Sequence, residues 1–159
     1  MSGTTKKDTI ILYGSYGYTG SLIAEECKSK KLAVILAGRN RESLQKQSET
    51  TGFPFEVVDL HDASLLGNLL RKGKLLLHCA GPFQFTAEIM LRACLEAGTH
   101  YTDVTGEYQV FEKLAEYDDE GKEVNIMIMP GVGFDVAPSD CLALHLKQRL
   151  PGATHLQLA

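Results

Sequence analysis

Short apolar runs of strand length alternate with longer segments of helical period along almost the whole chain, and this order limits its possible folds most. The runs are nearly continuous in Leu, Ile, Val and Ala, a pattern typical of strands that helices cover on both faces. Right-handed connections place the helices on both faces of a parallel sheet, so the order predicts an α/β protein with a doubly wound parallel sheet, a Rossmann fold. The expected strands are residues 9–14, 33–38, 55–59, 74–80, 100–104 and 124–130.

The segments between these runs place apolar residues three or four positions apart and charged residues on the opposite face, as amphipathic helices do. Gly98 and Gly121 stand where glycines that end helices are expected. The expected helices are residues 19–30, 41–51, 63–72, 86–98, 107–123 and 138–150.

The amino-acid composition and net charge of the chain limit the classes of protein to which it can belong. A chain of 159 residues with 44% hydrophobic residues fits one globular domain. Its net charge of -4 argues against nucleic-acid binding, which needs a basic face. The polar N-terminal sequence MSGTTKKDT lacks the apolar centre of a signal peptide, and no apolar stretch is long enough to cross a bilayer, so we expect a cytoplasmic protein without a transmembrane segment.

The cysteines and histidines do not form a recognisable site. The four cysteines lie far apart without a C-x-x-C pair, so free thiols are expected rather than a zinc or redox site. The five histidines are scattered, with no pair at metal-ligand spacing, and no catalytic triad can be argued from their positions. We therefore predict no metal. No Tyr-x-x-x-Lys is present, which disfavours a short-chain dehydrogenase.

Three glycines at a spacing of three follow the first expected strand and open the first helix, where a doubly wound sheet binds a dinucleotide. Gly14 permits a tight turn, Gly17 lets backbone N–H groups approach a pyrophosphate, and Gly20 lets the helix pack closely on the strand. The helix N-terminus would supply unpaired N–H groups and the positive end of its dipole. The alternative is a glycine-rich turn that binds no ligand.

The second strand tests the dinucleotide interpretation, because the G-x-x-G-x-x-G spacing differs from the usual G-x-G-x-x-G. A site selective for NAD places Asp or Glu at the end of that strand, and this chain places Arg39 there. A guanidinium suits the 2′-phosphate of NADP, and Asn40 and Arg41 could add donors. The sequence therefore predicts NADP in preference to NAD. Alternatively, Asn40 caps the next helix, and both interpretations can hold together.

Two further strand ends are candidates for the same site. Asp59 ends the third strand and could accept a hydrogen bond from the adenine amino group, or it could cap the helix that begins near Asp62. Ala80, Gly81 and Pro82 follow the fourth strand, where small residues would let the cofactor pass close to the backbone. A plain strand-to-helix turn explains these three residues equally simply.

Five motifs in order resemble the N-terminal NADP-binding domain of saccharopine dehydrogenase-like oxidoreductases, which include the mycobacterial trans-acting enoyl reductases. The resemblance runs from about Thr9 to the end of the chain. The family often has small residues, as in G-A-T-G, where this chain has Tyr16, whereas Thr19 is retained. The motifs are YGSYGYTG, LAGRN, CAGPF, AGTHYTDVTGE and PGVGFDVAPSD.

The resemblance implies a role for each part of the predicted site. The glycine-rich turn would bind the pyrophosphate, the end of the second strand the 2′-phosphate, the end of the third the adenine side, and the end of the fourth the ribose next to the nicotinamide. The residues are, in the same order, Gly14, Ser15, Tyr16, Gly17, Tyr18, Thr19 and Gly20; Arg39 and Asn40; Asp59 and Leu60; and Ala80, Gly81 and Pro82.

The downstream motifs leave the catalytic residues unassigned. Asp103, Thr105 and Glu107 could face the nicotinamide or a substrate. Alternatively, Thr105 or Gly106 caps the helix that carries Glu107. Ser139 and Asp140 follow Pro138, which suits the start of a helix, and we interpret them as helix-start residues.

The function implied by the resemblance is hydride transfer between NADP(H) and an imine, enoyl or keto substrate. We expect residues 1–150 to form the dinucleotide-binding domain and residues 151–159, with their apolar-polar alternation, to begin a C-terminal substrate domain. Such a fragment would have little activity alone, and an exposed apolar face could let it form a homodimer.

Three other functions remain open from the sequence. One is a non-catalytic NADP-sensing regulator, which shares every feature up to Pro82. Another is a methyltransferase, which needs an acidic residue at the end of the second strand and is disfavoured by Arg39. A structural domain with a vestigial pocket is the third.

Overall fold

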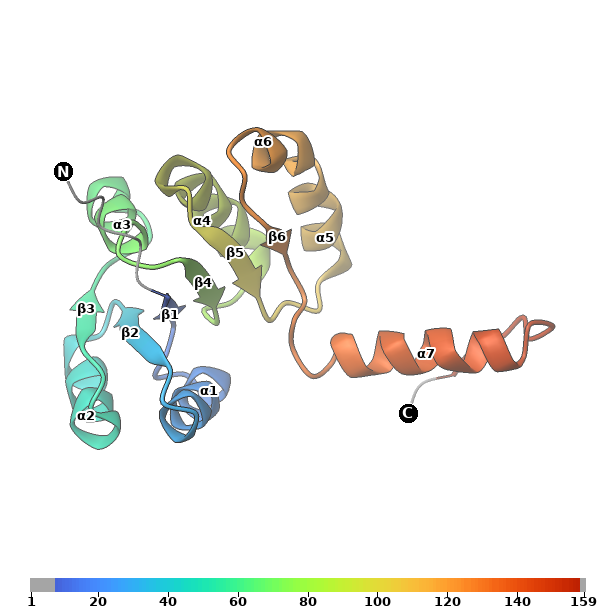
Figure 1. Cartoon of the computed structure of the whole chain (residues 1–159), viewed down its shortest axis with the longest axis horizontal. Helices are drawn as coiled ribbons and strands as arrows, with labels where there is room; N and C mark the ends of the chain where they lie inside the picture. The colour runs from blue at the N-terminus through green and yellow to red at the C-terminus, as the bar shows by residue number, and fades with distance from the viewer. Residues whose placement is uncertain (1–7, 158–159) are drawn as a thin grey trace.

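A computed structural model describes residues 8–157 and shows a six-stranded parallel sheet in the order β3-β2-β1-β4-β5-β6 (Figure 1). The strand order runs outward from β1 in one direction and from β4 in the other, which confirms the doubly wound sheet. The point of reversal between β1 and β4 is where such sheets bind ligands. The strands are β1 (Thr9–Tyr13), β2 (Ala33–Gly38), β3 (Phe55–Val57), β4 (Leu75–His78), β5 (His100–Asp103) and β6 (Ile128–Met129).

Helices cover both faces of the sheet, which explains why its strands are apolar throughout. On one face α1 (Tyr18–Ser29) and α2 (Arg41–Thr51) pack with Leu12 of β1. On the other face α3 (Ala63–Leu70), α4 (Phe83–Ala97) and α5 (Tyr108–Ala115) pack with Ile11 of the same strand. All neighbouring strands pair in parallel, so the carboxyl ends of the strands lie at one edge of the sheet.

The helix expected over residues 107–123 is two helices, α5 and α6 (Asp118–Glu123). The chain turns at Tyr117, whose ring is buried, and the guanidinium of Arg92 lies 4.9 Å from the centre of that ring. Three acidic residues then follow in the first turn of α6, where the helix dipole favours negative charge. The prediction that Gly121 ends a helix is wrong, because Gly121 lies within α6 and packs against Ile128.

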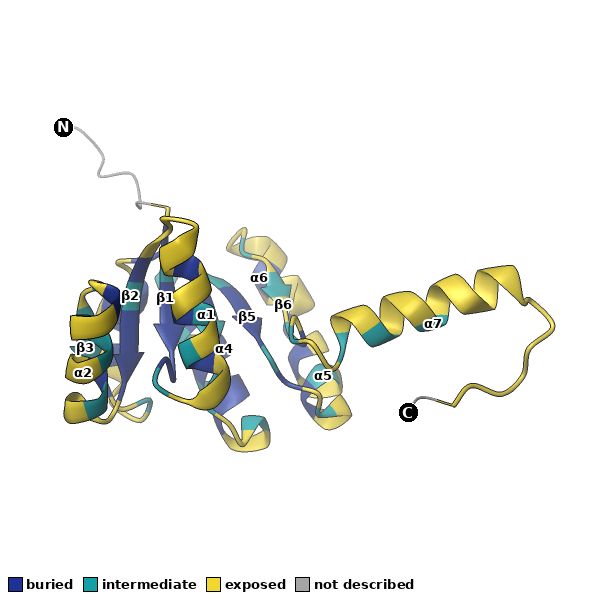
Figure 2. Cartoon of the chain, turned by 90° about the horizontal axis from the view of Figure 1, so that it is seen from below, coloured by how far each residue is buried: buried dark blue, intermediate teal, exposed yellow. Residues whose placement is uncertain are grey.

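The end of the described chain leaves the sheet. Helix α7 (Ala137–Arg149) extends away from it and has no buried residue, with Leu142, Leu144 and Leu146 exposed (Figure 2). The apolar-polar stretch that follows forms no strand up to residue 157. Within residues 8–157, no helix combines the length and apolar character needed to cross a membrane.

Candidate functional site

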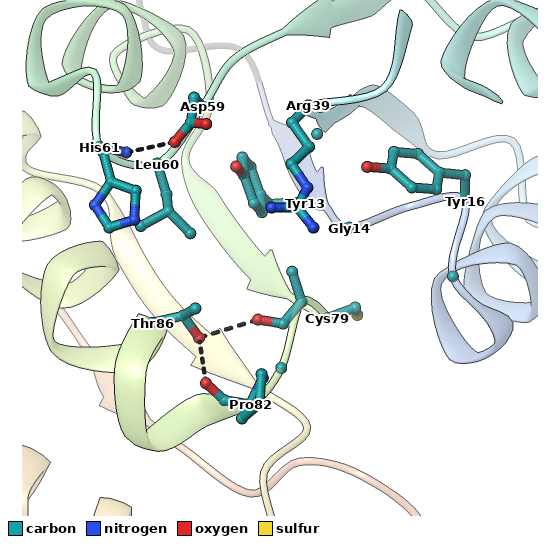
Figure 3. A pocket seen from close by; sticks show the side chains of 14 residues that line it. Tyr13, Gly14, Tyr16, Arg39, Asp59, Leu60, His61, Cys79, Pro82 and Thr86 are labelled. Carbon is teal, nitrogen blue, oxygen red and sulfur yellow. Dashed lines mark hydrogen bonds between the residues drawn. The ribbon is translucent and has the colours of Figure 1, made fainter. Parts of the chain in front are cut away.

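A cavity of about 430 Å³ opens at the carboxyl ends of β1, β2 and β4, where the strand order reverses (Figure 3). Its volume is typical of small-molecule sites. The predicted residues that line it are Gly14, Tyr16, Gly17, Arg39, Asp59, Leu60, Ala80, Gly81 and Pro82. The predicted residues that do not line it are Ser15, Tyr18, Thr19, Gly20 and Asn40. The structure thus brings together residues from four separate segments of the sequence.

The three glycines differ in what surrounds them. Gly14 has φ +78°, and a Cβ atom there would lie 2.9 Å from Ala80 Cβ. A Cβ atom at Gly20 would lie 2.4 Å from the Gly14 carbonyl oxygen, because α1 starts directly against the turn. At Gly17 the nearest atom to an added Cβ is the same oxygen at 3.3 Å. Gly14 and Gly20 are therefore required for packing, whereas a Cβ atom at Gly17 would make a single, less severe close contact.

Ser15 is fully buried and supports the turn from behind. Its hydroxyl donates to Gln47 Oε1 at 2.7 Å, and Gln47 Nε2 donates back to the Ser15 carbonyl at 2.7 Å. The glycine-rich turn is thereby attached to α2. Tyr18 and Thr19 form the exposed first turn of α1.

Of the first four helices, α2, α3 and α4 have a side chain that caps the N-terminus, whereas α1 has none. Asn40 caps α2 and Asp62 caps α3, each by accepting a hydrogen bond from a backbone amide of its helix at 2.9 Å. The Glu107 carboxylate caps α4 by accepting from two of its first amides at 3.0 Å each. Helix α1 begins after Gly17 with no side-chain cap and no acidic residue in its first turn. Gly17, which precedes α1, lines the cavity, so the first amides of the helix can bind an anion held beside Gly17.

Arg39 follows β2 with an exposed side chain that lines the cavity. No hydrogen bond or salt bridge joins its guanidinium to another residue of the described chain. In Figure 3 the side chain extends across the cavity toward Tyr13. Tyr13 donates to the Val58 carbonyl at 2.9 Å, and burial, followed by the charge of Asp59, raises its pKa to about 12. Arg39 thus offers its donors to a ligand beside a neutral phenol.

Asp59 lies in the loop between β3 and α3. Its Oδ1 atom accepts a hydrogen bond from the backbone amide of His61 at 2.9 Å, which tightens the loop. Because Asp62 caps α3, the alternative in which Asp59 caps that helix is wrong. Asp59 therefore presents a carboxylate at the cavity wall.

The wall formed by residues 80–82 is supported by a hydrogen-bond network that the sequence reading missed. The Thr86 hydroxyl lies 3.0 Å from the Ala80 carbonyl oxygen and 3.3 Å from that of Pro82 (Figure 3). His78 Nε2 lies 2.9 Å from the same hydroxyl oxygen. Because the hydroxyl donates to a carbonyl, we assign the Nε2–H tautomer to His78, which leaves Nδ1 buried without a hydrogen-bond partner. This network fixes the backbone at the base of the cavity.

Burial of His78 predicts a dependence of stability on pH. Burial lowers the pKa of His78 from the usual 6.5 of a histidine to about 3. As the pH falls below about 6.5, His78 takes up a proton in the unfolded state but not in the folded state. The stabilisation that comes from the neutral, buried ring is therefore fully present above that pH and is progressively lost below it. We expect the free energy of unfolding to fall by about 1.4 kcal/mol per pH unit from this residue alone between about pH 6 and pH 4.

Urea denaturation over this pH range, compared with His78→Phe, measures this contribution. Phenylalanine keeps an aromatic ring between Tyr13 and Phe83, which both pack against His78. In the variant, the free energy of unfolding should fall with decreasing pH by about 1.4 kcal/mol per pH unit less than in the unmodified chain. Equal slopes would show that His78 titrates alike in both states.

Asp103 and Glu107 have structural partners and do not line the cavity. Asp103 is fully buried and accepts hydrogen bonds from the Tyr101 hydroxyl at 2.6 Å and the Gly131 amide at 2.8 Å. These bonds attach β5 to the segment after β6, and burial raises the Asp103 pKa. The Thr105 hydroxyl accepts a hydrogen bond from the Glu107 amide at 3.1 Å. The prediction that Thr105 caps the helix is nevertheless wrong, because the N-cap of α5 is Glu107 and no side chain caps that helix.

The remaining candidates also have structural explanations. Ser139 donates to the Asp135 carbonyl at 2.9 Å at the start of α7, as expected of a helix-start residue. Cys27 and Cys94 are buried, whereas Cys79 is partly buried and Cys141 is exposed. Across residues 8–157, no three metal-ligating side chains come together.

Comparison with known proteins identifies the family. The model of the saccharopine dehydrogenase NADP-binding domain matches residues 10–129. The chain belongs to this family. It is therefore an NADP-binding domain of the saccharopine dehydrogenase-like oxidoreductases, as the five motifs predict.

Relatives in animals and bacteria are similar in sequence to nearly the whole chain. The saccharopine dehydrogenase-like oxidoreductase of Mus musculus is 29% identical over 163 residues, which cover 90% of this chain and 38% of the relative. The trans-acting enoyl reductase of Mycobacterium ulcerans is 27% identical over 157 residues, which cover 94% of this chain and 38% of the relative. The NADP-binding domain thus spans well under half the length of these relatives.

Solved structures share the fold. The apo saccharopine dehydrogenase (L-Glu forming) of Saccharomyces cerevisiae superimposes with a TM-score of 0.79 at 18% identity, covering 92% of this chain and 32% of that one. The yeast methylglyoxal/isovaleraldehyde reductase Gre2, solved with NADPH, gives a TM-score of 0.62 at 16% identity, covering 77% of this chain and 53% of the other. These identities are low, so the likeness establishes the Rossmann fold alone.

Proposed function

We propose that this NADP-binding domain prefers NADP(H) to NAD(H) and serves an enzyme that transfers hydride between NADP(H) and an imine, enoyl or keto substrate. The observation that carries the preference is the combination, at one cavity, of the uncapped N-terminus of α1 and the unpaired guanidinium of Arg39. NADP carries anionic groups at two places, a pyrophosphate and a 2′-phosphate. The cavity offers a separate set of donors to each.

The orientation of the cofactor follows from the order of these groups around the cavity. The first amides of α1 bind the pyrophosphate, because the Gly14 and Gly17 amides of the preceding turn already donate to backbone carbonyls. Arg39 binds the 2′-phosphate. Asp59 and Leu60 lie on the adenine side, and residues 80–82 lie against the ribose next to the nicotinamide. When bound, the cofactor supplies the hydride chemistry. The chain itself binds and orients it.

The substrate face belongs in this proposal to a second domain, which residues 151–159 would begin. Two observations support it. Helix α7 exposes its leucines to solvent, and helices of this length are marginal in water without a packing partner. The domain also covers 38% of its mouse relative. The exposed leucines of α7 could instead pack against a second copy of this chain, and we propose this homodimer as the alternative. Sedimentation of the isolated domain distinguishes a monomer from a dimer.

Thermal unfolding of the 159-residue chain tests the cofactor preference. A ligand present at about 100 times its Kd stabilises a protein by about 2.7 kcal/mol, which raises Tm by about 5–10 °C for a domain of this size. We expect NADP⁺ to produce such a shift and NAD⁺ at the same concentration to produce about half of it or less. Equal shifts would contradict the preference, and no shift with either would contradict binding by the isolated domain.

An NADP-sensing regulator is the second candidate, and two ionisable groups that line the cavity, Tyr13 and Cys79, favour it. Burial raises the pKa of both Tyr13 and Cys79 to about 12, so neither exchanges a proton readily near neutral pH. An assay of NADPH oxidation by a protein that contains this domain and the catalytic region, with imine, enoyl and keto compounds, separates the candidates. Oxidation supports the enzyme, whereas NADPH binding without oxidation of any compound supports the sensor.

A further inference from the structure

We infer that Tyr16 is a specificity residue for the 2′-phosphate, to which its hydroxyl donates a hydrogen bond. The inference rests on the proposed preference for NADP(H) and adds a residue to it. The resemblance to the family places position 16 in the pyrophosphate-binding turn. The structure places the Tyr16 side chain elsewhere in the same cavity.

The ring of Tyr16 lies over the end of β2. A Cβ atom added at Gly38 would lie 2.6 Å from Cε1 of Tyr16, so the ring packs directly on the Gly38 backbone. Gly38 immediately precedes Arg39. The tyrosine therefore extends from the glycine-rich turn to the residue that we assign to the 2′-phosphate.

The hydroxyl of Tyr16 has one hydrogen-bond partner and one unused proton. Its oxygen accepts from the backbone amide of Asn40 at 3.3 Å. No acceptor for the hydroxyl proton is present among residues 8–157. In Figure 3 the hydroxyl points toward Arg39. The hydroxyl, fixed by the ring and by the Asn40 amide, thus presents a free donor beside an unpaired guanidinium.

A phosphate is the acceptor that fits these two donors. Its oxygens accept several hydrogen bonds at once, and bonds with a charged partner are stronger than neutral ones. The 2′-hydroxyl of NAD carries no charge and offers one oxygen. A Tyr16 bond therefore contributes more to NADP(H) than to NAD(H), which makes the residue a determinant of specificity.

The experiment is a fluorescence titration of the 159-residue chain and of Tyr16→Phe with NADPH and NADH. Phenylalanine keeps the ring on Gly38 and removes only the hydroxyl. We expect the Kd of NADPH to rise about tenfold, since a bond to a charged group is lost, and that of NADH to stay within about twofold. Tyr108→Phe is the matched control, because Tyr108 is exposed and lies outside the cavity. It should change neither Kd.

An unchanged or lower Kd of Tyr16→Phe for NADPH would overturn the inference, as would equal losses for both cofactors. Arg39→Gln separates this failure from failure of the proposed function. If the unmodified chain prefers NADPH, and Arg39→Gln loses the preference but Tyr16→Phe keeps it, only the role of Tyr16 is wrong. If the unmodified chain binds both cofactors alike, the proposed preference and the role of Tyr16 are both wrong.

Discussion

Arg39→Asp is expected to raise the Kd of NADPH by at least about 100-fold and to leave the Kd of NADH unchanged or lower. Two or more charge-assisted hydrogen bonds are lost, and each contributes about 1.5–3 kcal/mol. The new carboxylate also repels the 2′-phosphate, whereas it can accept hydrogen bonds from the ribose hydroxyls of NADH. Titration of the variant with both cofactors measures the two constants.

The structure supplies a control for this substitution. Arg149→Asp makes the same change in net charge in α7, outside the cavity, and should leave both constants within about twofold. Arg39 has no hydrogen bond or salt bridge to the rest of the described chain, so its replacement should leave the unfolding midpoint almost unchanged. Equal losses of NADPH and NADH binding would remove Arg39 from the 2′-phosphate.

Gly20→Ala is expected to destabilise the domain by about 2–4 kcal/mol, the range of severe overpacking. The added Cβ would lie 2.4 Å from the Gly14 carbonyl oxygen and 2.7 Å from that of Ser15. Both are backbone atoms of the turn, so α1 must move away from the sheet to make room. Urea denaturation measures the loss, and a variant as stable as the unmodified chain would show that α1 is not fixed against the turn.

Gly17→Val is expected to have the opposite effects to Gly20→Ala: it should abolish cofactor binding and leave the fold intact. Gly17 has φ -69°, which any residue adopts, and an added Cβ would approach only the Gly14 oxygen, at 3.3 Å. The fold should therefore persist by circular dichroism. The side chain would fill the space through which a pyrophosphate approaches the amides, so binding of both cofactors should be abolished. Unchanged affinity would place the pyrophosphate elsewhere.

The sheet and the residues brought together at its edge were largely predictable from sequence. Continuous apolar runs indicate buried parallel strands, and parallel strands place their carboxyl ends at one edge. Gly14, Arg39, Asp59 and Ala80 each follow a strand, so their meeting at one cavity follows from the topology alone. The break between α5 and α6 was not predictable, because the helical period continues through Tyr117 and only its packing against α4 reveals the turn.

The contacts that fix the site depend on tertiary packing that local spacing does not encode. Glu107 caps α4 across 24 and 23 positions of sequence, although it begins a helix of its own. By sequence alone, His78 is one of five scattered histidines without an assigned role. Its place at the end of β4 was a usable signal, because a polar residue that ends a buried strand needs a partner at that edge. Thr86, one helical turn beyond the motif CAGPF, is that partner.

A fluorescence titration of the unmodified 159-residue chain with NADPH and NADH, side by side, tests the central claim most directly. The account predicts saturable binding of both, with a Kd for NADPH at least about tenfold lower, since charge-assisted bonds to the 2′-phosphate are absent with NADH. Equal Kd values, or a lower value for NADH, would contradict the assignment of Arg39 and the preference that rests on it.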